Sequence, residues 1–462
     1  MIKKVEKSKR EISSFRDPAG YIYYEDNKVI RRVNKEYFKQ YEHLMTSGLY
    51  DELVEKGYLI KHREIDGNKE YKLLEVEKVP FISYPYEWCY DEVKDAAILT
   101  LNIQEIALKY NMILKDASSY NVQFIGGKAI FIDTLSFDFY EEGMPWGAYG
   151  QFVRHFMAPL LLNTYVDERC SSLLRNYIDG FPLDLVNNLL KNRGGFTARM
   201  HIKWHNKSID KNNDVSDGVK KVNISKISII NMNQMMLRQI SKLRRKVTDT
   251  EWDNYYNVTN YDEVSDKCKI KLVKEYLEEI DFNNESLVYD LGANDGKYSR
   301  IANERCQNVV SFDIDTNCVN RNYLIERDKE RSGILPLLLD INNPSGGIGF
   351  GCTERKSIND RGRVDCLMAL ALIHHIVISN NVPFESVARW FIKLSKYLII
   401  EFVPKEDKQV LKLLKTRRDI FSEYDQESFE RIFSKYYKIV KKDNIKNSKR
   451  VLYLMQVNED EE

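Results

Sequence analysis

The sequence predicts an α/β protein in which an α+β domain precedes a doubly wound, mainly parallel sheet of the Rossmann-like kind. Short apolar runs alternate with amphipathic helical segments through the C-terminal half, as parallel strands and crossover helices do. Two further apolar runs near the end are joined by a polar turn, as in a hairpin. A polar segment, residues 205–223, separates this half from a first half whose mixture of apolar and polar residues is also typical of a folded domain.

The elements of the C-terminal half follow in a regular order. Parallel strands are predicted at residues 286–292, 308–315, 334–341, 365–373 and 396–403. The fourth is a continuous apolar run, which indicates a strand covered on both faces. Helices are predicted at 297–306, 318–329 and 382–395, and the final hairpin at 436–445 and 450–457. The sheet is therefore predicted to be seven-stranded, and the domains to be 1–204, a linker 205–230, and 231–462.

Composition excludes several classes of function. Lys and Arg number 70 against 69 Asp and Glu, so no overall positive charge indicates a nucleic-acid partner. No apolar run reaches the ~18 residues of a membrane span, and the basic N-terminus lacks the apolar segment of a secretory signal. The 7 cysteines are scattered without a C-x-x-C pair, which argues against a disulfide framework or a zinc site. We therefore expect a cytoplasmic protein.

The turn after the first strand of this sheet carries the strongest chemical signal. The strand ends in Asp290, and Gly292, Asn294 and Gly296 follow. Ligands of such sheets bind at the carboxyl ends of the strands, where small residues let a ligand approach the backbone. The second strand ends in Asp313, and a carboxylate can accept hydrogen bonds from both hydroxyls of a ribose. A dinucleotide-binding turn would read G-x-G-x-x-G, whereas this one reads D-x-G-x-N-x-G.

Together with Asp340 at the end of the third strand and the final hairpin, this ordered set resembles the class I S-adenosylmethionine-dependent methyltransferases over residues 231–460. The stretches "LALIHHIVISNNVPF" and "IEFVPK" also look like a bacterial subgroup that includes nodulation-associated methyltransferases. The resemblance implies S-adenosylmethionine as cofactor, with the first turn at its methionine part, Asp313 at the ribose and Asp340 near the adenine amino group. The cofactor-binding residues that it implies are Asp290, Gly292, Ala293, Asn294, Gly296, Asp313, Ile314, Asp340 and Ala369.

Candidate catalytic residues follow the fourth and fifth strands. His374 and His375 fall where the reaction would occur, and one of them could be a general base or could only brace the site. Glu401 could orient the acceptor, or could form a salt bridge with Lys405 in the loop. No second ligand motif supports a metal reading of the two histidines and Glu401, so no metal site is predicted.

Two features point to the methyl acceptor. The long glycine-rich loop 342–363 contains Glu354, Arg355, Ser357 and Arg361, and long loops at this end of a sheet usually carry function. The aromatic residues Trp252, Tyr255, Tyr256 and Tyr261 precede the first strand, where they could form a lid or simply pack a helix. The acceptor is expected to be an oxygen or nitrogen nucleophile of a small molecule, a glycan or a peptide.

The N-terminal half holds a second motif. Asp116 and Asn121 precede a strand–turn–strand pattern that ends at Asp133. Their order resembles the catalytic core of the protein-kinase-like fold, which implies a proton-accepting Asp116 and magnesium ligands Asn121 and Asp133, with ATP as the nucleotide. No glycine-rich phosphate loop is found, and strand 28–33 offers arginines where a lysine is expected. A phosphotransferase, a non-catalytic module that binds a nucleotide or the acceptor, and turn-bracing residues all stay open.

Overall fold

The computed structural model describes residues 10–195, 199–203, 223–247, 262–415 and 417–458. The chain divides into two compact units, which are described separately. Unit 1 comprises Met1–Val247 and Gly347–Arg355, and unit 2 comprises Thr248–Gly346 and Lys356–Glu462. The segment Gly347–Arg355 belongs to the contacts of unit 1, although it lies in the sequence between two strands of unit 2.

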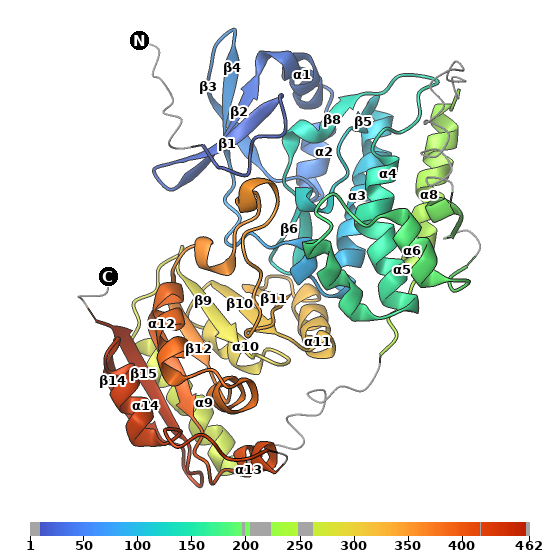
Figure 1. The fold of residues 1–462 in the computed structure, drawn as a ribbon. Helices are drawn as coiled ribbons and strands as arrows, with labels where there is room; N and C mark the ends of the chain where they lie inside the picture. Colours follow the sequence, from blue (N-terminus) through green and yellow to red (C-terminus); the bar gives the residue numbers. More distant parts are fainter. Residues whose placement is uncertain (1–9, 196–198, 204–222, 248–261, 416, 459–462) are drawn as a thin grey trace. The chain divides into compact units, whose positions relative to one another are not determined.

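Unit 2 is built on a seven-stranded sheet with the order β11-β10-β9-β12-β13-β15-β14 (Figure 1). The strands β9 to β13 pair in parallel, and β15 pairs antiparallel with both β13 and β14. Their bounds are β9 Leu287–Leu291, β10 Asn308–Asp313, β11 Ile334–Leu338, β12 Val364–Ala369, β13 Ser395–Phe402, β14 Tyr437–Asn444 and β15 Val451–Val457. Every strand predicted in this half is present, and so is the final hairpin.

Helices cover both faces of this sheet. On one face, alternate residues of the strands, among them Val288, Met368 and Ile399, pack against apolar residues of α9 and α10. On the other face, Phe384 of α12 packs against Phe402 of β13. The helices of unit 2 are α9 Glu263–Glu278, α10 Lys297–Asn303, α11 Thr316–Arg327, α12 Phe384–Leu394, α13 Lys408–Leu414 and α14 Gln426–Phe433. Because the central strands are buried on both sides, polar side chains reach solvent only at the strand ends.

Unit 1 begins with a four-stranded antiparallel sheet in the order β1-β2-β4-β3. Its strands are β1 Gly20–Glu25, β2 Lys28–Asn34, β3 His62–Gly67 and β4 Tyr71–Val76, and two helices, α1 Phe38–Thr46 and α2 Leu49–Glu55, lie between β2 and β3 in the sequence. Two short antiparallel pairs of strands follow: β5 Met112–Leu114 pairs with β8 Phe137–Phe139, and between them in the sequence β6 Val122–Ile125 and β7 Lys128–Phe131 form a hairpin. The remaining helices are α3 Tyr90–Lys109, α4 Tyr149–Phe152, α5 Ala158–Tyr165, α6 Leu183–Leu190 and α8 Lys226–Lys242.

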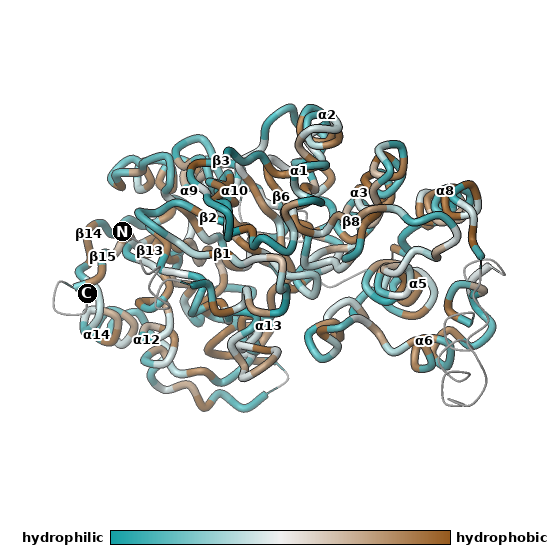
Figure 2. Tube along the Cα trace, turned by 90° about the horizontal axis from the view of Figure 1, so that it is seen from above, coloured by the Kyte–Doolittle hydropathy of each residue, from teal (hydrophilic) through white to brown (hydrophobic). Residues whose placement is uncertain are grey.

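Helix α8 corrects the predicted domain boundary. The prediction assigned residues 205–230 to a linker and residues from 231 onward to the second domain, whereas α8 packs on α3 inside unit 1. Asn233 is fully buried and donates from Nδ2 to the Leu101 carbonyl oxygen at 2.9 Å. The buried residues of α8, Ile229, Asn233, Met236 and Ile240, recur at helical spacing, and Figure 2 shows hydrophilic and hydrophobic residues mixed along this helix, which is the pattern of a helix with one buried face. Such a pattern predicts a helix but does not say which domain the helix covers.

No helix in the described part of the chain combines the length and the hydropathy that a bilayer crossing requires.

Candidate functional site

The turn between β9 and α10 is held against the end of β10 by backbone hydrogen bonds. The amides of Gly292 and Ala293 both donate to the Phe312 carbonyl oxygen, at 2.9 and 3.0 Å. Gly292, Asn294 and Gly296 all have positive φ, at 72°, 53° and 82°, a conformation that glycine and asparagine adopt with least strain. The small residues of the predicted motif are therefore required by the shape of the turn.

Asp313 lies directly against this turn. Its Oδ2 accepts from the Asn294 amide at 2.8 Å, and its Oδ1 accepts from the Asp315 amide at 2.9 Å. The side chain is only partly buried, and a carboxylate has about four lone-pair positions, so acceptor capacity is left for a ligand. Burial raises the pKa of Asp313 to about 6, while the backbone amides act in the opposite direction.

Asp290 is buried behind the turn. Its Oδ2 accepts from the Ser299 hydroxyl at 2.6 Å, and Ser299 lies on α10. Burial raises the pKa of Asp290 to about 6, and the Ser299 hydroxyl and the nearby Lys269 ammonium oppose that rise. Two carboxyl groups with raised pKa values thus flank one turn, which is an arrangement that a bound cation would stabilise in its ionised form.

The other implied cofactor residues end neighbouring strands. Asp340 follows β11 and accepts from the Asn342 amide at 2.9 Å. Ala369 is the last residue of β12 and is buried, whereas the Ile314 side chain, beside Asp313, is 57% exposed. The parallel register of β11, β10, β9 and β12 brings these strand ends to one edge of the sheet. An exposed apolar side chain at this edge offers a surface on which an adenine ring could lie.

The two histidines lie next to each other after β12. Their ring centroids are 4.1 Å apart, and His374 is fully buried while His375 is half-buried. Burial, with contributions from His375, Arg450 and Lys269, lowers the pKa of His374 well below its usual value. Burial and Arg450 lower the pKa of His375 to about 4. Both imidazoles are therefore neutral at neutral pH and able to accept a proton or a hydrogen bond.

Glu401 is held in a buried ion-pair network. Its Oε2 lies 2.6 Å from the Lys269 ammonium and its Oε1 accepts from Arg450 at 3.1 Å. Arg450 also pairs with Asp407 through two of its nitrogens, at 2.8 and 3.1 Å. The salt bridge proposed between Glu401 and Lys405 is not formed, because Lys405 pairs with Asp419 at 2.9 Å. Removing one partner of a buried ion pair typically costs about 3–5 kcal/mol, so Glu401 has a structural task whatever else it does.

The two features predicted to contact the methyl acceptor have different outcomes. The aromatic residues Trp252, Tyr255, Tyr256 and Tyr261 lie outside the described residues. In the glycine-rich loop, Glu354 accepts two hydrogen bonds from Arg16, at 2.5 and 2.9 Å, within unit 1. The Arg355 guanidinium lies over the Tyr120 ring, 4.1 Å from its centroid, also within unit 1. These two loop residues are thus engaged with the N-terminal half rather than presented to a ligand of unit 2.

Asp116, Asn121 and Asp133, the residues of the predicted kinase-like motif, lie in unit 1. Asp133 forms an ion pair with Arg31 of β2 and accepts from the Ser136 hydroxyl at 2.5 Å. Asn121 donates to that same Ser136 hydroxyl oxygen at 3.1 Å, and Asp116 accepts from the Ser118 amide at 2.9 Å. Arg31 is therefore the cation that faces Asp133, which its sequence context did not reveal.

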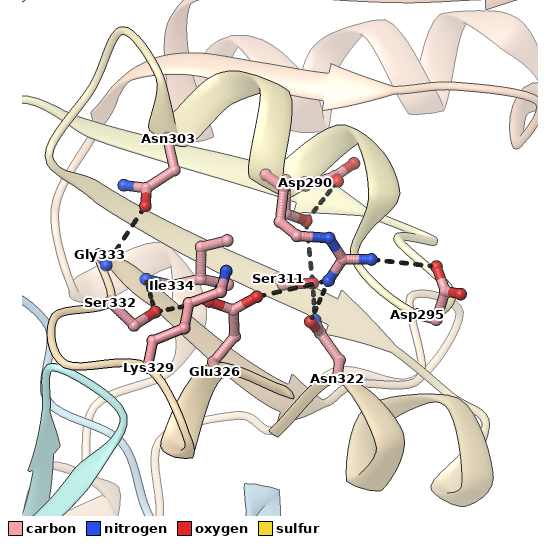
Figure 3. A network of polar contacts seen from close by, with 12 residues as sticks. Asp290, Asp295, Asn303, Ser311, Asn322, Glu326, Lys329, Ser332, Gly333 and Ile334 are labelled. Atoms are coloured by element: carbon pink, nitrogen blue, oxygen red, sulfur yellow. Dashed lines mark hydrogen bonds and ion pairs between the residues drawn. The ribbon is translucent and has the colours of Figure 1, made fainter. Parts of the chain in front are cut away.

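Several polar residues at these sites were not singled out from the sequence. Lys269 and Arg450 neutralise Glu401, and Figure 3 shows a polar network around Asp290 that includes Ser311, Asn322 and Glu326. In the sequence these residues look like ordinary helix and strand positions. Their shared signal is that each is buried although polar, which is uncommon without a partner. Within the described ranges, no three His, Cys, Asp or Glu side chains gather as metal ligands would.

The order of the strands, with its antiparallel last hairpin, is that of the class I methyltransferase fold, and an acid stands at the end of each of its first three strands. The chain belongs to the family of nodulation protein NoeA. It is 31% identical to NoeA of Rhizobium meliloti (strain 1021) over 467 residues, which cover 97% of this chain and 96% of that protein. No family model matches the chain.

Two solved structures are similar to a smaller part of it. The N-methyltransferase NodS from Bradyrhizobium japonicum WM9 is 8% identical, covering 43% of this chain and 99% of its own, with a TM-score of 0.31. The magnesium protoporphyrin IX methyltransferase ChlM from Synechocystis PCC 6803 with bound SAH is 14% identical, covering 44% of this chain and 92% of its own, with a TM-score of 0.29.

Proposed function

We propose that unit 2 transfers the methyl group of S-adenosylmethionine to an oxygen or nitrogen nucleophile of a small molecule, a glycan or a peptide. The observation that carries this proposal is the position of the Asp313 carboxylate. It is fixed by two backbone amides at the edge of the Gly292–Gly296 turn and keeps free lone pairs. A carboxylate at that place suits the two hydroxyls of a ribose.

The described residues fit such a cofactor. Gly292 and Gly296 have positive φ, and a Cβ at Gly292 would lie 3.1 Å from the Leu372 side chain. The two glycines carry no side chain, so at these positions a ligand can approach the backbone closely. Asp290, Gly292 and Asn294 would hold the methionine part, and Asp313 with Ile314 would hold the ribose. Asp340 and Ala369 would flank the base. S-adenosylmethionine supplies an activated methyl group when it is bound, so the protein's task is mainly alignment.

Proton removal from the acceptor is the second task. We assign it to His375 because His375 is half-buried and neutral, whereas His374 is fully buried. An imidazole with a pKa of about 4 is a weak base, so His375 would accept the proton only as the methyl group is transferred. His374 would brace the His375 ring, against which it lies at a tilt. Glu401 would hold the surrounding elements through Lys269 and Arg450 rather than act as the base.

The direct test is calorimetric titration of the full chain with S-adenosylhomocysteine. Asp313→Ala removes the proposed ribose contact, and we expect it to weaken binding by about 100-fold, since it deletes two hydrogen bonds to a charged group. Asp328→Ala is a matched control, because Asp328 is exposed just after α11. A folded wild-type chain that does not bind S-adenosylhomocysteine would exclude the proposed function. Equal binding by both variants would exclude the role of Asp313.

A second candidate function concerns unit 1. The ion pair between Arg31 and Asp133, together with the Ser136 link to Asn121, favours a site for a nucleotide with magnesium. An arginine can bind phosphate as well as carboxylate, so Arg31 could turn from Asp133 to a phosphate group while magnesium neutralises the acid. The active form of this hypothesis is a phosphotransferase, and the inactive form is a module that binds a nucleotide or the acceptor.

Thermal unfolding with ATP and magnesium separates these alternatives from a purely structural cluster. Asp133→Asn keeps the shape of the side chain, and Asp51→Asn changes an exposed acid of α2 as the control. Stabilisation by magnesium-ATP in the wild type that Asp133→Asn alone abolishes supports a nucleotide site. ATP turnover that the same variant loses supports the phosphotransferase. No stabilisation of the wild type leaves Asp116, Asn121 and Asp133 as structural residues.

A further inference from the structure

An unbroken set of side-chain hydrogen bonds runs from Arg300 to Asp290. Arg300 donates to Asn322 Oδ1 at 3.1 Å, and Asn322 Nδ2 donates to Ser311 Oγ at 2.9 Å. Ser311 Oγ lies 3.0 Å from Ser299 Oγ, which donates to Asp290 Oδ2 at 2.6 Å. Figure 3 shows this line of contacts between Asn322 and Asp290. Residues of two strands and two helices thus meet in one buried chain.

The chemistry of the groups fixes the direction of every bond in this chain. The amide nitrogen of Asn322 only donates, so Ser311 must accept from it. An ionised Asp290 only accepts, so Ser299 must donate to it. The bond between the two hydroxyls is then necessarily Ser311 donating to Ser299. All four bonds therefore point from the guanidinium toward the carboxylate, and such aligned bonds polarise and strengthen one another.

The far end of the chain is anchored. Arg300 also lies 3.4 Å from Glu326 and 3.6 Å from Asp295. Glu326 is fully buried, and it accepts further bonds from Lys329 at 2.6 Å and from Ser332 at 2.7 Å. The Glu326 carboxylate is buried and held by several donors, so it has little freedom to move. Its ion pair therefore fixes the position of the Arg300 guanidinium.

Asn322 is also packed against the Gly292–Gly296 turn, which is called the cofactor turn below. A Cβ at Gly296 would lie 2.3 Å from Asn322 Oδ1 and 2.5 Å from Nδ2, so only glycine leaves room for this amide. Asn322 itself is fully buried. Gly296 therefore has two reasons to lack a side chain, its positive φ and the amide that fills the space beside it.

From these contacts we infer that Ser299, Ser311 and Asn322 are positioning residues that hold the Asp290 carboxylate ionised and oriented behind the cofactor turn. The inference deepens the proposed function and rests on it, since Asp290 matters only if the turn holds the cofactor. None of the three is placed to touch the cofactor, and each acts through Asp290.

Other charged and titratable groups face Asp290 from each element packed around it. They are Lys269 from α9, Arg300 from α10, Asp313 from β10 and Cys366 from β12. Burial is the largest influence and raises the pKa of Asp290 to about 6, while the Ser299 hydrogen bond lowers it. Removing a donor from the chain therefore raises the pKa of Asp290 further, and a smaller fraction of it is ionised near neutral pH.

The test compares Ser299→Ala, Ser311→Ala and Asn322→Ala. The Asp290 carboxyl pKa is followed by carbon-13 NMR, with the resonance assigned from Asp290→Asn. We expect the pKa to rise most in Ser299→Ala, less in Ser311→Ala and least in Asn322→Ala, because the donors lie progressively further from Asp290. S-adenosylhomocysteine affinity should fall about tenfold in Ser299→Ala near pH 6.5 and less near pH 8.5. Ser299→Thr keeps the hydroxyl and should restore both values.

The control is Asn303→Ala, which removes an asparagine of α10 that donates to the Cys306 and Gln307 carbonyls and accepts from the Gly333 amide, and that has no direct hydrogen bond to any of the residues from Arg300 to Asp290 in this series. It should leave the Asp290 pKa at its wild-type value. An Asp290 pKa that is equal in Ser299→Ala, Ser311→Ala and Asn322→Ala would overturn the inference. It would also be overturned if the pKa changes followed the loss of stability of each variant instead of the place of each residue in the hydrogen-bond series. A wild type that fails to bind S-adenosylhomocysteine would remove the proposed function, and the role at the cofactor with it. The NMR titration still reports on the hydrogen-bond chain itself.

Discussion

Two acids, the partly buried Asp133 in unit 1 and the buried Asp290 in unit 2, have opposite electrostatic surroundings. Burial raises the pKa of Asp133, but Arg31 and the Ser136 hydroxyl outweigh it, so the pKa lies below its usual value. Asp290 has a hydroxyl donor, while Lys269 and Arg300 act on it from farther away, and burial raises its pKa to about 6. Asp133 forms a direct ion pair with Arg31, whereas Asp290 has no directly paired cation among the residues that the structure describes. A positively charged ligand would complete the second environment and would have to displace Arg31 from the first.

The largest expected effect comes from Asp133→Ala. The change leaves the Arg31 guanidinium buried without its carboxylate, and we expect it to destabilise unit 1 by about 3–5 kcal/mol. The pKa of Asp133 is depressed on folding, so its contribution is present above the pKa of the unfolded chain and is lost as pH falls through the folded value. Urea unfolding near pH 7 and near pH 3 measures both. A loss of stability that is equal at the two pH values would contradict the ion-pair explanation.

Asp290→Asn is expected to change the stability in the opposite direction and to stabilise unit 2 near pH 8. Because folding raises the pKa of Asp290 to about 6, its stabilising effect is full below the unfolded pKa and is lost as pH rises through 6. The ionised acid therefore costs about 2–3 kcal/mol near pH 8, and Asn should make unit 2 more stable there by up to that amount. Near pH 4 the two proteins should unfold alike. Thermal unfolding checks this, and a variant less stable than wild type near pH 8 would contradict it.

The smallest effect is in the release of protons on ligand binding. If a cationic ligand completes the environment of Asp290 and Asp313, its binding near pH 6 should release roughly half a proton from each acid, since each has a pKa of about 6 in the free protein. Calorimetry with S-adenosylmethionine in buffers of different ionisation enthalpy measures the release, which should vanish near pH 8. Equal release at both pH values would show that these acids do not respond to the ligand.

The sequence was informative where the backbone itself demands particular residues. Gly292, Asn294 and Gly296 have positive φ, and the strands of unit 2 are apolar runs in the sequence, so the fold and the turn could both be predicted. Polar partners that are distant in the sequence and meet only in the folded protein could not be predicted. Lys269 and Arg450 lie far from Glu401 in the chain, and Asn322 is 26 residues from Gly296, whose missing Cβ it explains. Nothing local distinguishes such residues from the exposed polar residues around them.

The segment Gly347–Arg355 has a consequence for how such a protein can be divided. It lies in the sequence between β11 and β12 of unit 2, yet Glu354 pairs with Arg16 and the Arg355 guanidinium lies over the Tyr120 ring. Cutting the gene between the halves would remove a structural piece from the first and leave an unanchored loop in the second. A single cut in the sequence therefore does not separate the two units.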